Sequence, residues 1–299
     1  MVGSTIPRRA FGRYLRGMRE RAGVTLLTAG VQIETSKQTV LRVEDGLPTK
    51  VTTPQLQVLF DLYKVSPAAR AEALELWEEV KQHTRAAKVQ GTAKAWWQQY
   101  SGQYAPHFDH YLRLETSANH LSTYQSVLVH GLLQTPRYRR AIIEATHPNM
   151  SAIDVDRRLE LAARRQERLS DNTFRYEVML SEAVLRHQPG GASAMAEQLS
   201  HLATVSEREN VSIRVVPFSG GMYLGLVVQS FALLEFPPLA RHLVEMPVVY
   251  VDGCEGALYM EHADVIARFR HALMDIDRVA LSKNDTRDLM SRIAKEYAT

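Results

Sequence analysis

Apolar residues recur at helical spacing in two short, adjacent segments near the N-terminus. Leu26, Ala29 and Ile33 lie at i, i+3 and i+7, so they share one face of a helix. Val40 and Val43 lie at i and i+3 in the next segment. The pattern predicts two amphipathic helices, separated by a tight turn, with both apolar faces directed into a common core.

Residues at the ends of these segments favour the same boundaries. Thr25 and Ser36 each precede a segment, and a hydroxyl there can accept a hydrogen bond from an unpaired amide of the first turn. Gly46 follows the second segment and can adopt the left-handed backbone conformation that ends many helices. The sequence therefore predicts a helix, a turn and a second helix within residues 23–46.

Further helices are expected on both sides of this pair. Upstream, Phe11, Leu15 and Met18 lie at i, i+4 and i+7, which predicts a first helix that packs on the pair. Downstream, Thr53 and Pro54 are expected to be the N-cap and first-turn proline of another helix.

Beyond these helices the pattern mixes strands with helices. Residues 174–180 and 211–215 alternate with a period of two, which is typical of strands, and parts of 226–236 and 248–251 do the same. Residues 95–145 are aromatic and are expected to be mostly helical. The fold class is therefore expected to be α+β, mostly α.

Three parts are expected along the chain. Residues 1–66 are predicted to form an all-α helix-turn-helix domain, and residues 67–94 a helical connector that ends near Gly91. Residues 95–299 are predicted to form a larger α+β domain in which helices cover a small sheet.

The outward face of the second helix carries the chemistry of base recognition. Glutamine can pair with adenine, arginine can pair with guanine, and a threonine methyl can touch thymine. The candidate base-reading residues are therefore Gln38, Thr39 and Arg42. Phosphate contacts set the register of a protein on DNA, and the candidates for them here are Thr25, Ser36 and Lys37. From this pattern alone, a helical hairpin with a solvated polar face remains the alternative.

Charge is unevenly distributed along the chain. The net charge is +3, yet the first 66 residues contain ten basic and five acidic side chains. Basic residues crowd the start of the chain, and such a block attracts phosphate and releases counterions on binding. We therefore add Arg8, Arg9 and Arg13 to the candidate phosphate contacts, with a solvated helix face as the alternative.

Residues 9–65 resemble the XRE type of helix-turn-helix regulator, which has the lambda-repressor-like fold. The residues that carry this resemblance are Phe11, Leu15, Arg19, Thr25, Ala29, Ile33, Ser36, Thr39, Val40, Arg42, Val43, Glu44 and Gly46. Thr35 stands where a hydrophobic residue is usual, Glu34 where a turn glycine is usual, and Gly30 where alanine is common. The last two of these departures have a known energetic cost. Each of the two costs about 1 kcal/mol of local stability.

The remainder of the chain resembles the C-terminal domain of a large actinobacterial family of XRE regulators. The matching pieces are Trp96-Trp97, residues 131–135 with Tyr138, and residues 164–166, 181–186, 215–218, 231–236, 248–256 and 258–259. The resemblance implies an effector-sensing or antitoxin-like role, a small protein partner, and a place in development or secondary metabolism.

Aromatic side chains gather in the first part of the larger domain. Trp96, Trp97, Tyr100 and Tyr138 are the candidate residues for binding an effector or a partner helix. A core at the domain joint is the alternative interpretation, because such side chains bury large apolar areas. The arginine pairs 157–158 and 164–165 are expected on a solvated helix face.

Catalytic and metal-binding patterns are weak. The segments 107–110 (HFDH) and 261–264 (EHAD) could each supply part of a metal site, but no third ligand is fixed by spacing. Cys254 is expected to be a buried thiol. We therefore predict no catalytic residue, no metal and no cofactor, and expect that the chain is not an enzyme.

A single cysteine indicates a reducing compartment, and no signal-peptide core or membrane-spanning run is evident. A cytoplasmic, sequence-specific DNA-binding transcriptional regulator is therefore expected, which binds double-stranded DNA as a homodimer and responds to a small-molecule effector or a small protein. The alternative is an antitoxin-like module that neutralises a small partner and binds DNA only secondarily. An enzyme regulated through a DNA-binding arm is a third, weaker alternative.

Overall fold

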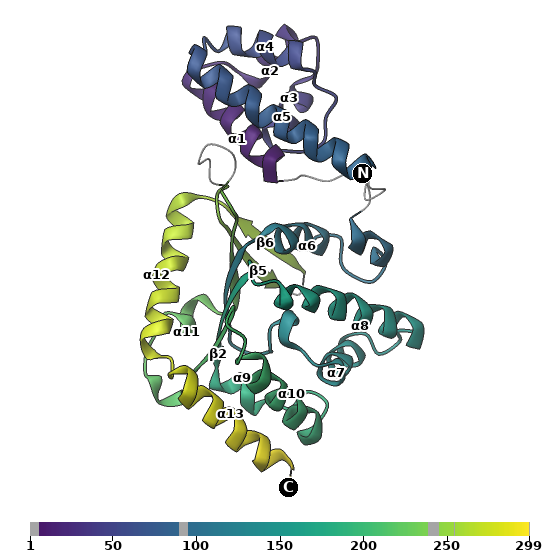
Figure 1. The fold of residues 1–299 in the computed structure, drawn as a ribbon, viewed down its shortest axis with the longest axis vertical. Coiled ribbons are helices and arrows are strands. Elements are labelled where there is room, and N and C mark those ends of the chain that lie inside the picture. The colour runs from purple at the N-terminus through teal and green to yellow at the C-terminus, as the bar shows by residue number, and fades with distance from the viewer. Residues whose placement is uncertain (1–5, 90–94, 239–244, 254, 299) are drawn as a thin grey trace. The chain divides into compact units, whose positions relative to one another are not determined.

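The computed structural model describes residues 6–89, 95–238, 245–253 and 255–298 (Figure 1). The chain divides into two compact units. The helical unit consists of Met1–Gln99 and Pro237–Met246, and the C-terminal unit of Tyr100–Phe236 and Pro247–Thr299. The expected α+β, mostly α fold class is confirmed by a helical N-terminal region and a C-terminal unit with a sheet.

The helical unit is built from amphipathic helices around one core. They are α1 (Ile6–Arg21), α2 (Leu26–Gln32), α3 (Lys37–Glu44), α4 (Thr53–Leu62) and α5 (Pro67–Val89). Most of the apolar positions that predicted the first three helices are buried, and Leu26 is partly buried against the same core; the buried ones are Phe11, Leu15, Met18, Ala29, Ile33, Val40 and Val43. Periodicity therefore identified the faces of these helices correctly.

Two details of the helical unit differ from the predictions. First, α5 packs against α1 and clusters with the other helices, whereas the sequence suggested a separate connector over 67–94. Its Leu76 and Val80 belong to the common core. Second, the N-cap of α4 is Thr52 and not Thr53, because Thr52 and Gln55 form a reciprocal capping box.

The C-terminal unit contains a mixed six-stranded sheet. Its strands are β1 (His120–Gln125), β2 (Arg175–Ser181), β3 (Val211–Val216), β4 (Phe231–Glu235), β5 (Val248–Gly253) and β6 (Gly256–Met260). The order is β3-β2-β1-β4-β5-β6, with β1, β2 and β3 parallel and the other pairs antiparallel. The four strands predicted from alternation are β2, β3, β4 and β5. The central β1 lies in a region expected to be mostly helical, and that expectation is wrong for these six residues.

Helices lie on both sides of this sheet, with α12 on one side and α6 and α8 on the other (Figure 1). The α-helices are α6 (Phe108–Ser117), α7 (Pro136–Thr146), α8 (Ala152–Gln166), α9 (Glu182–Arg186), α10 (Ala192–Val205), α11 (Gly225–Val228), α12 (Ala263–Val279) and α13 (Lys283–Ala298). Short 3₁₀ helices are η1 (Trp96–Tyr100), η2 (Gly131–Leu133), η3 (Glu167–Ser170) and η4 (Phe218–Gly220). Within the described residues, none of the helices combines the length and the apolarity that a bilayer crossing needs.

Candidate nucleic-acid interface

The ends of α2 and α3 are capped as their sequences predict. The Thr25 hydroxyl accepts a hydrogen bond from the Thr28 amide at 3.1 Å, and the Ser36 hydroxyl accepts one from the Thr39 amide at 3.2 Å. Gly46 takes a φ of +67°, so it ends the second helix in the left-handed conformation. These contacts fix where both helices of the motif begin and where α3 stops.

Glu34 and Gly30, two positions that depart from the XRE pattern, lie in or against the turn between α2 and α3. Glu34 has a φ of 54°, a conformation that costs a non-glycine residue about 1 kcal/mol. At Gly30, an added Cβ would lie 2.9 Å from the Thr35 carbonyl oxygen, so the turn backbone approaches this position closely. Glycine at position 30 therefore lowers helix propensity but allows the turn to pack tightly on α2.

The outward face of α3 carries the predicted base-reading side chains. Gln38 and Arg42 are exposed and one turn apart, while Thr39 is partly buried, with its hydroxyl 3.1 Å from that of Ser36. The Arg42 guanidinium donates to the Pro48 carbonyl at 3.3 Å, which holds it near the end of the helix. Leu41, which sequence reasoning did not select, is 39% exposed on the same helix and could contact a thymine methyl group.

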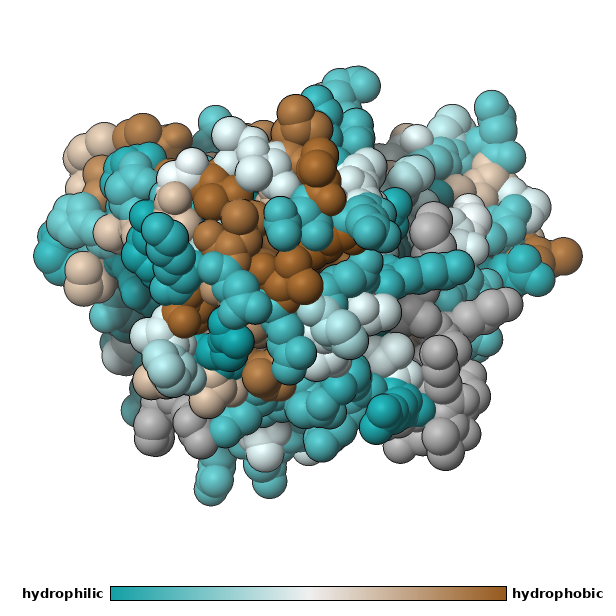
Figure 2. Space-filling model, turned by 90° about the horizontal axis from the view of Figure 1, so that it is seen from above, coloured by the Kyte–Doolittle hydropathy of each residue, from teal (hydrophilic) through white to brown (hydrophobic). Residues whose placement is uncertain are grey.

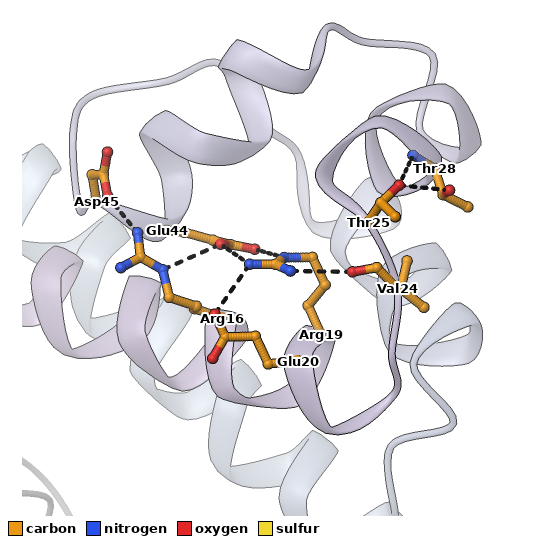
Figure 3. A network of polar contacts seen from close by, with 8 residues as sticks. All are labelled: Arg16, Arg19, Glu20, Val24, Thr25, Thr28, Glu44 and Asp45. Atoms are coloured by element: carbon orange, nitrogen blue, oxygen red, sulfur yellow. Dashed lines mark hydrogen bonds and ion pairs between the residues drawn. The ribbon is translucent and has the colours of Figure 1, made fainter.

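A buried carboxylate fixes α3 against α1 (Figure 3). Glu44 is 1% exposed and accepts two hydrogen bonds from Arg19, from Nε at 2.6 Å and from Nη2 at 2.8 Å. Arg16 Nε donates to the same carboxylate at 3.3 Å, and Arg19 Nη1 donates to the Val24 carbonyl at 3.1 Å. The hydrogen bonds to Glu44 raise the pKa of Arg19. This bidentate pair orients the recognition helix relative to α1.

The three N-terminal arginines have partners inside the helical unit. Arg8 Nη2 donates to the Thr84 hydroxyl at 2.8 Å, and desolvation lowers the pKa of Arg8. Arg9 is 6% exposed, with its Nε 3.2 Å from the Glu245 carboxylate, which also pairs with Arg13. If Arg9 and Arg13 contact phosphates as predicted, a DNA phosphate replaces the Glu245 carboxylate as their partner.

Of the four aromatic candidates for effector binding, Trp96, Trp97 and Tyr100 lie in η1 and Tyr138 lies in α7. Trp96 and Trp97 make an edge-to-face contact, with ring centroids 5.6 Å apart, and cluster with the helical unit. Tyr100 and Tyr138 belong to the C-terminal unit and are buried, and the Tyr138 hydroxyl accepts a hydrogen bond from the Val129 amide.

Three other expectations concern an arginine pair, possible metal ligands and the single cysteine. The pair 164–165 was expected on a solvated face, but Arg165 is 5% exposed and makes two hydrogen bonds to the buried Glu115. Among the described residues, no three His, Cys, Asp or Glu side chains are grouped so that they could hold a metal ion. The buried thiol expected at Cys254 lies outside the described residues.

Apolar side chains are also exposed on the helical unit. On α2, Leu27 is 62% and Val31 is 68% exposed, and their i, i+4 spacing places them on one face. Seen from above, the molecule shows a group of apolar side chains bordered by hydrophilic ones (Figure 2).

The capped helix pair and its polar outer face define a helix-turn-helix DNA-binding protein of XRE-like type. A model described as a helix-turn-helix domain matches residues 10–73. A second model, described as a domain of unknown function (DUF5753), matches residues 108–292. Because the second match covers more than half of the chain, the protein belongs to the DUF5753 family. Neither a curated protein nor a solved structure matches the chain.

Proposed function

We propose that this protein is a sequence-specific transcriptional regulator in which α3 enters the major groove of DNA. Gln38, Thr39 and Arg42 read base edges, and Thr25, Ser36 and Lys37 contact phosphates. The observation that carries this proposal is the exposed pair Gln38 and Arg42 on a helix that Ser36 caps. These two side chains are suited to adenine and guanine, respectively.

A homodimer is the expected DNA-binding form. Two copies of α3 would occupy successive major grooves about 34 Å apart, so the operator would contain two related half-sites. The N-terminal arginines would add phosphate contacts outside each half-site. This arrangement makes binding strongly salt-dependent, because each phosphate contact releases counterions.

The C-terminal unit is proposed to control DNA binding by sensing an effector. An effector that binds one arrangement of the molecule more tightly than another shifts the population toward that arrangement. This role is supported by the partly apolar cavity of the C-terminal unit. The protein is proposed to act in the cytoplasm, in development or secondary metabolism, and the support for that role is the resemblance to actinobacterial regulators.

Substitutions on α3 test the proposed base reading. Arg42→Ala should weaken binding to the selected operator by about 1 to 3 kcal/mol and leave binding to scrambled DNA nearly unchanged. Lys37→Ala should weaken binding to both DNAs and reduce the salt slope by about one. Equal losses for Arg42→Ala on both DNAs would contradict base reading, and an unchanged slope would remove Lys37 from the phosphate contacts.

An antitoxin-like protein-binding role is the second candidate, and exposed apolar residues of the C-terminal unit favour it. Phe218 is 67%, Met222 is 69% and Val227 is 64% exposed, and α11, to which Val227 belongs, lies against α12. A small protein could cover these side chains. Co-purification of a partner without operator affinity would favour this function over the first.

A further inference from the structure

The C-terminal unit contains a cavity of about 280 Å³ beside the central strands of its sheet. Its lining comes from α6, α7, α8, β1, β4 and β5, and from residues 128–134. The volume is close to the lower end of small-molecule sites, about 300 to 1,000 Å³. The cavity therefore suits a compact ligand rather than a peptide or a nucleotide.

One wall of the cavity is aromatic. Phe108 stacks on Tyr111 with ring centroids 5.2 Å apart, and Tyr111 lies 4.3 Å from Tyr250 by the same measure. Phe231 of β4 also lines the cavity. Such a wall favours a flat apolar group in the ligand, because ring faces and edges make extensive contact at little entropic cost.

The lining also contains a cation that forms no ion pair within the described residues, Arg139. Arg139 Nη1 donates to Gln134 Oε1 at 3.0 Å, but its Nε is buried and makes no hydrogen bond. Across the described part of the chain, no carboxylate lies within 4.0 Å of the Arg139 guanidinium. Desolvation, and then the nearby positive charges of Arg165 and Arg158, lower the pKa of Arg139 to about 10.

Among the other ionisable groups near the cavity, Glu115 attracts the Arg139 charge, but the carboxylate of Glu115 is already paired with Arg165. Arg165 forms an ion pair with Glu115, which neutralises its charge. Burial alone would raise the pKa of Glu115, but the attraction of Arg165 outweighs burial and lowers it. His130 is partly buried, and desolvation lowers its pKa to about 4, so it is uncharged near neutral pH. Asp252 also lines the cavity, but its side chain is 64% exposed and well solvated. Arg139 is therefore the group that an anion would bind.

The guanidinium groups of Arg139 and Arg165 both lie close to Gly131. A Cβ at this glycine would lie 3.2 Å from Arg165 Nη1 and 3.8 Å from Arg139 Nη1. Gly131, Arg139 and Arg165 all line the cavity, so the two guanidinium groups border the same part of it. A carboxylate in that part of the cavity could accept hydrogen bonds from both arginines, and such charge-assisted bonds are about twice as strong as neutral ones.

We infer that this cavity binds a small organic carboxylate, with its carboxylate between Arg139 and Arg165 and its apolar part against Tyr111 and Phe231. This inference names the chemistry of the effector in the proposed regulatory function. It rests on that proposed function only where an effect of the ligand on DNA binding is expected. The lining strands β4 and β5 are joined by Pro237–Met246, the segment that belongs to the helical unit. The strands that line the cavity are therefore linked through the polypeptide chain to the helical unit.

Calorimetric titration of the full chain without DNA tests the chemistry of the site. The probes are phenylacetate, the neutral 2-phenylethanol, the cationic 2-phenylethylamine and inorganic phosphate. Phenylacetate should bind at least about tenfold more tightly than the alcohol and the amine. Equal affinity for the alcohol, a preference for phosphate, or no phenylacetate binding at millimolar concentration would each overturn the proposal.

Variants locate the site. Arg139→Gln should weaken phenylacetate binding at least about tenfold, whereas Arg137→Gln should not, because Arg137 is exposed on the same helix and bonds to Ser193. Gly131→Ala should also weaken binding, because the added methyl group would crowd the two guanidinium groups. This second variant keeps the test possible if Arg139→Gln does not fold. Wild-type affinity in either folded variant would overturn the proposal.

Separate readouts distinguish this inference from the proposed function. A chain that binds its operator but not phenylacetate rejects the carboxylate site and leaves the regulator intact. A chain that binds phenylacetate but no DNA rejects the regulator and leaves the site intact.

Discussion

At the scale of single residues, Glu44 is the carboxylate on which the geometry of α3 depends. Its side chain has no exposure, and two arginines of α1 surround it. Removal of one partner from a buried ion pair leaves an uncompensated charge, which is far more costly than the loss of an exposed pair. The orientation of the proposed recognition helix is therefore set by a contact that faces away from DNA.

Glu44→Gln should lower the free energy of unfolding of the helical unit by about 3 kcal/mol or more, because the Arg19 guanidinium loses its counterion. Urea unfolding followed by circular dichroism measures this loss. Glu20→Gln is the matched control: Glu20 is 60% exposed and lies 3.5 Å from the same guanidinium. Similar losses in both variants would show that the buried pair has no special role.

His120 links three strands through two carboxylates. Its Nε2 lies 3.2 Å from Glu177 of β2, and its Nδ1 lies 2.9 Å from Glu235 of β4. Hydrogen bonds to both carboxylates raise the pKa of His120 to about 9, and those from His120 lower the pKa of each glutamate to about 2. The stabilisation by His120 is therefore complete below about pH 6.5.

The stability of the wild-type chain should fall between pH 6.5 and about 9, as His120 loses its proton and its attraction to Glu177 and Glu235. His120→Gln should show a smaller fall over the same range. Thermal unfolding at a series of pH values measures both slopes. The glutamates contribute in the other direction, with stabilisation that is lost as the pH falls from about 4.5 toward 2. An identical pH profile in the variant would contradict the linkage.

At the scale of elements, α1 and α3 approach so closely that only glycine fits between them. A Cβ at Gly12 would lie 2.5 Å from the carbonyl oxygens of Val43 and Glu44. At Gly17, one turn further along α1, the nearest atom would be the flexible end of Arg21 at 3.3 Å. The close approach of α1 and α3 therefore requires glycine at position 12 but not at position 17. The sequence alone does not distinguish these two glycines.

Gly12→Ala should destabilise the helical unit by about 1 to 3 kcal/mol, because α1 and α3 must move apart. Gly17→Ala should be neutral or should stabilise it by up to about 1 kcal/mol through helix propensity. Chemical unfolding of both variants provides the comparison. A stable Gly12→Ala variant would show that the crossing is looser than the structure indicates.

The sequence predicted those elements whose pattern is local. The helices α2 and α3 followed from apolar spacing and two N-cap residues, because each signal lies within one turn of the element that it marks. The strand β1 was missed because it lies centrally in the sheet, with Ser122 and Thr123 buried and hydrogen-bonded. A strand buried on both faces does not alternate between polar and apolar positions.

The candidate effector site was missed for a different reason. Arg139 and Arg165 lie on separate helices, and only the folded chain brings them to the same point beside Gly131. The arginine pair 164–165 was expected in solvent because its helix is strongly charged, yet Arg165 faces Glu115 inside the unit. Contacts between residues so far apart in sequence leave no periodic signal.

At the scale of the whole molecule, the connection between β4 and β5 belongs to the helical unit. Glu245 of this connection pairs with Arg9 and Arg13 of α1, two of the proposed phosphate contacts. Its carboxylate and a DNA phosphate would therefore compete for the same guanidinium groups. A change in β4 or β5 that withdraws Glu245 would favour DNA binding.

Glu245→Gln should strengthen binding to non-specific DNA and steepen its salt dependence, because Arg9 and Arg13 no longer neutralise a carboxylate. Glu255→Gln changes the net charge equally at an exposed position and is the control. Fluorescence anisotropy at several salt concentrations measures both effects. Equal effects of the two substitutions would mean that net charge, and not release of the arginines, is responsible.

The most direct test of the account is selection of bound sequences from random double-stranded DNA by the full chain and by its Arg42→Ala variant. The wild-type protein should enrich a two-fold symmetric motif with half-sites about one helical turn apart. The variant should keep this motif but lose the preference for guanine at one position in each half-site. No enriched motif, or the same motif from both proteins, would contradict base reading by α3.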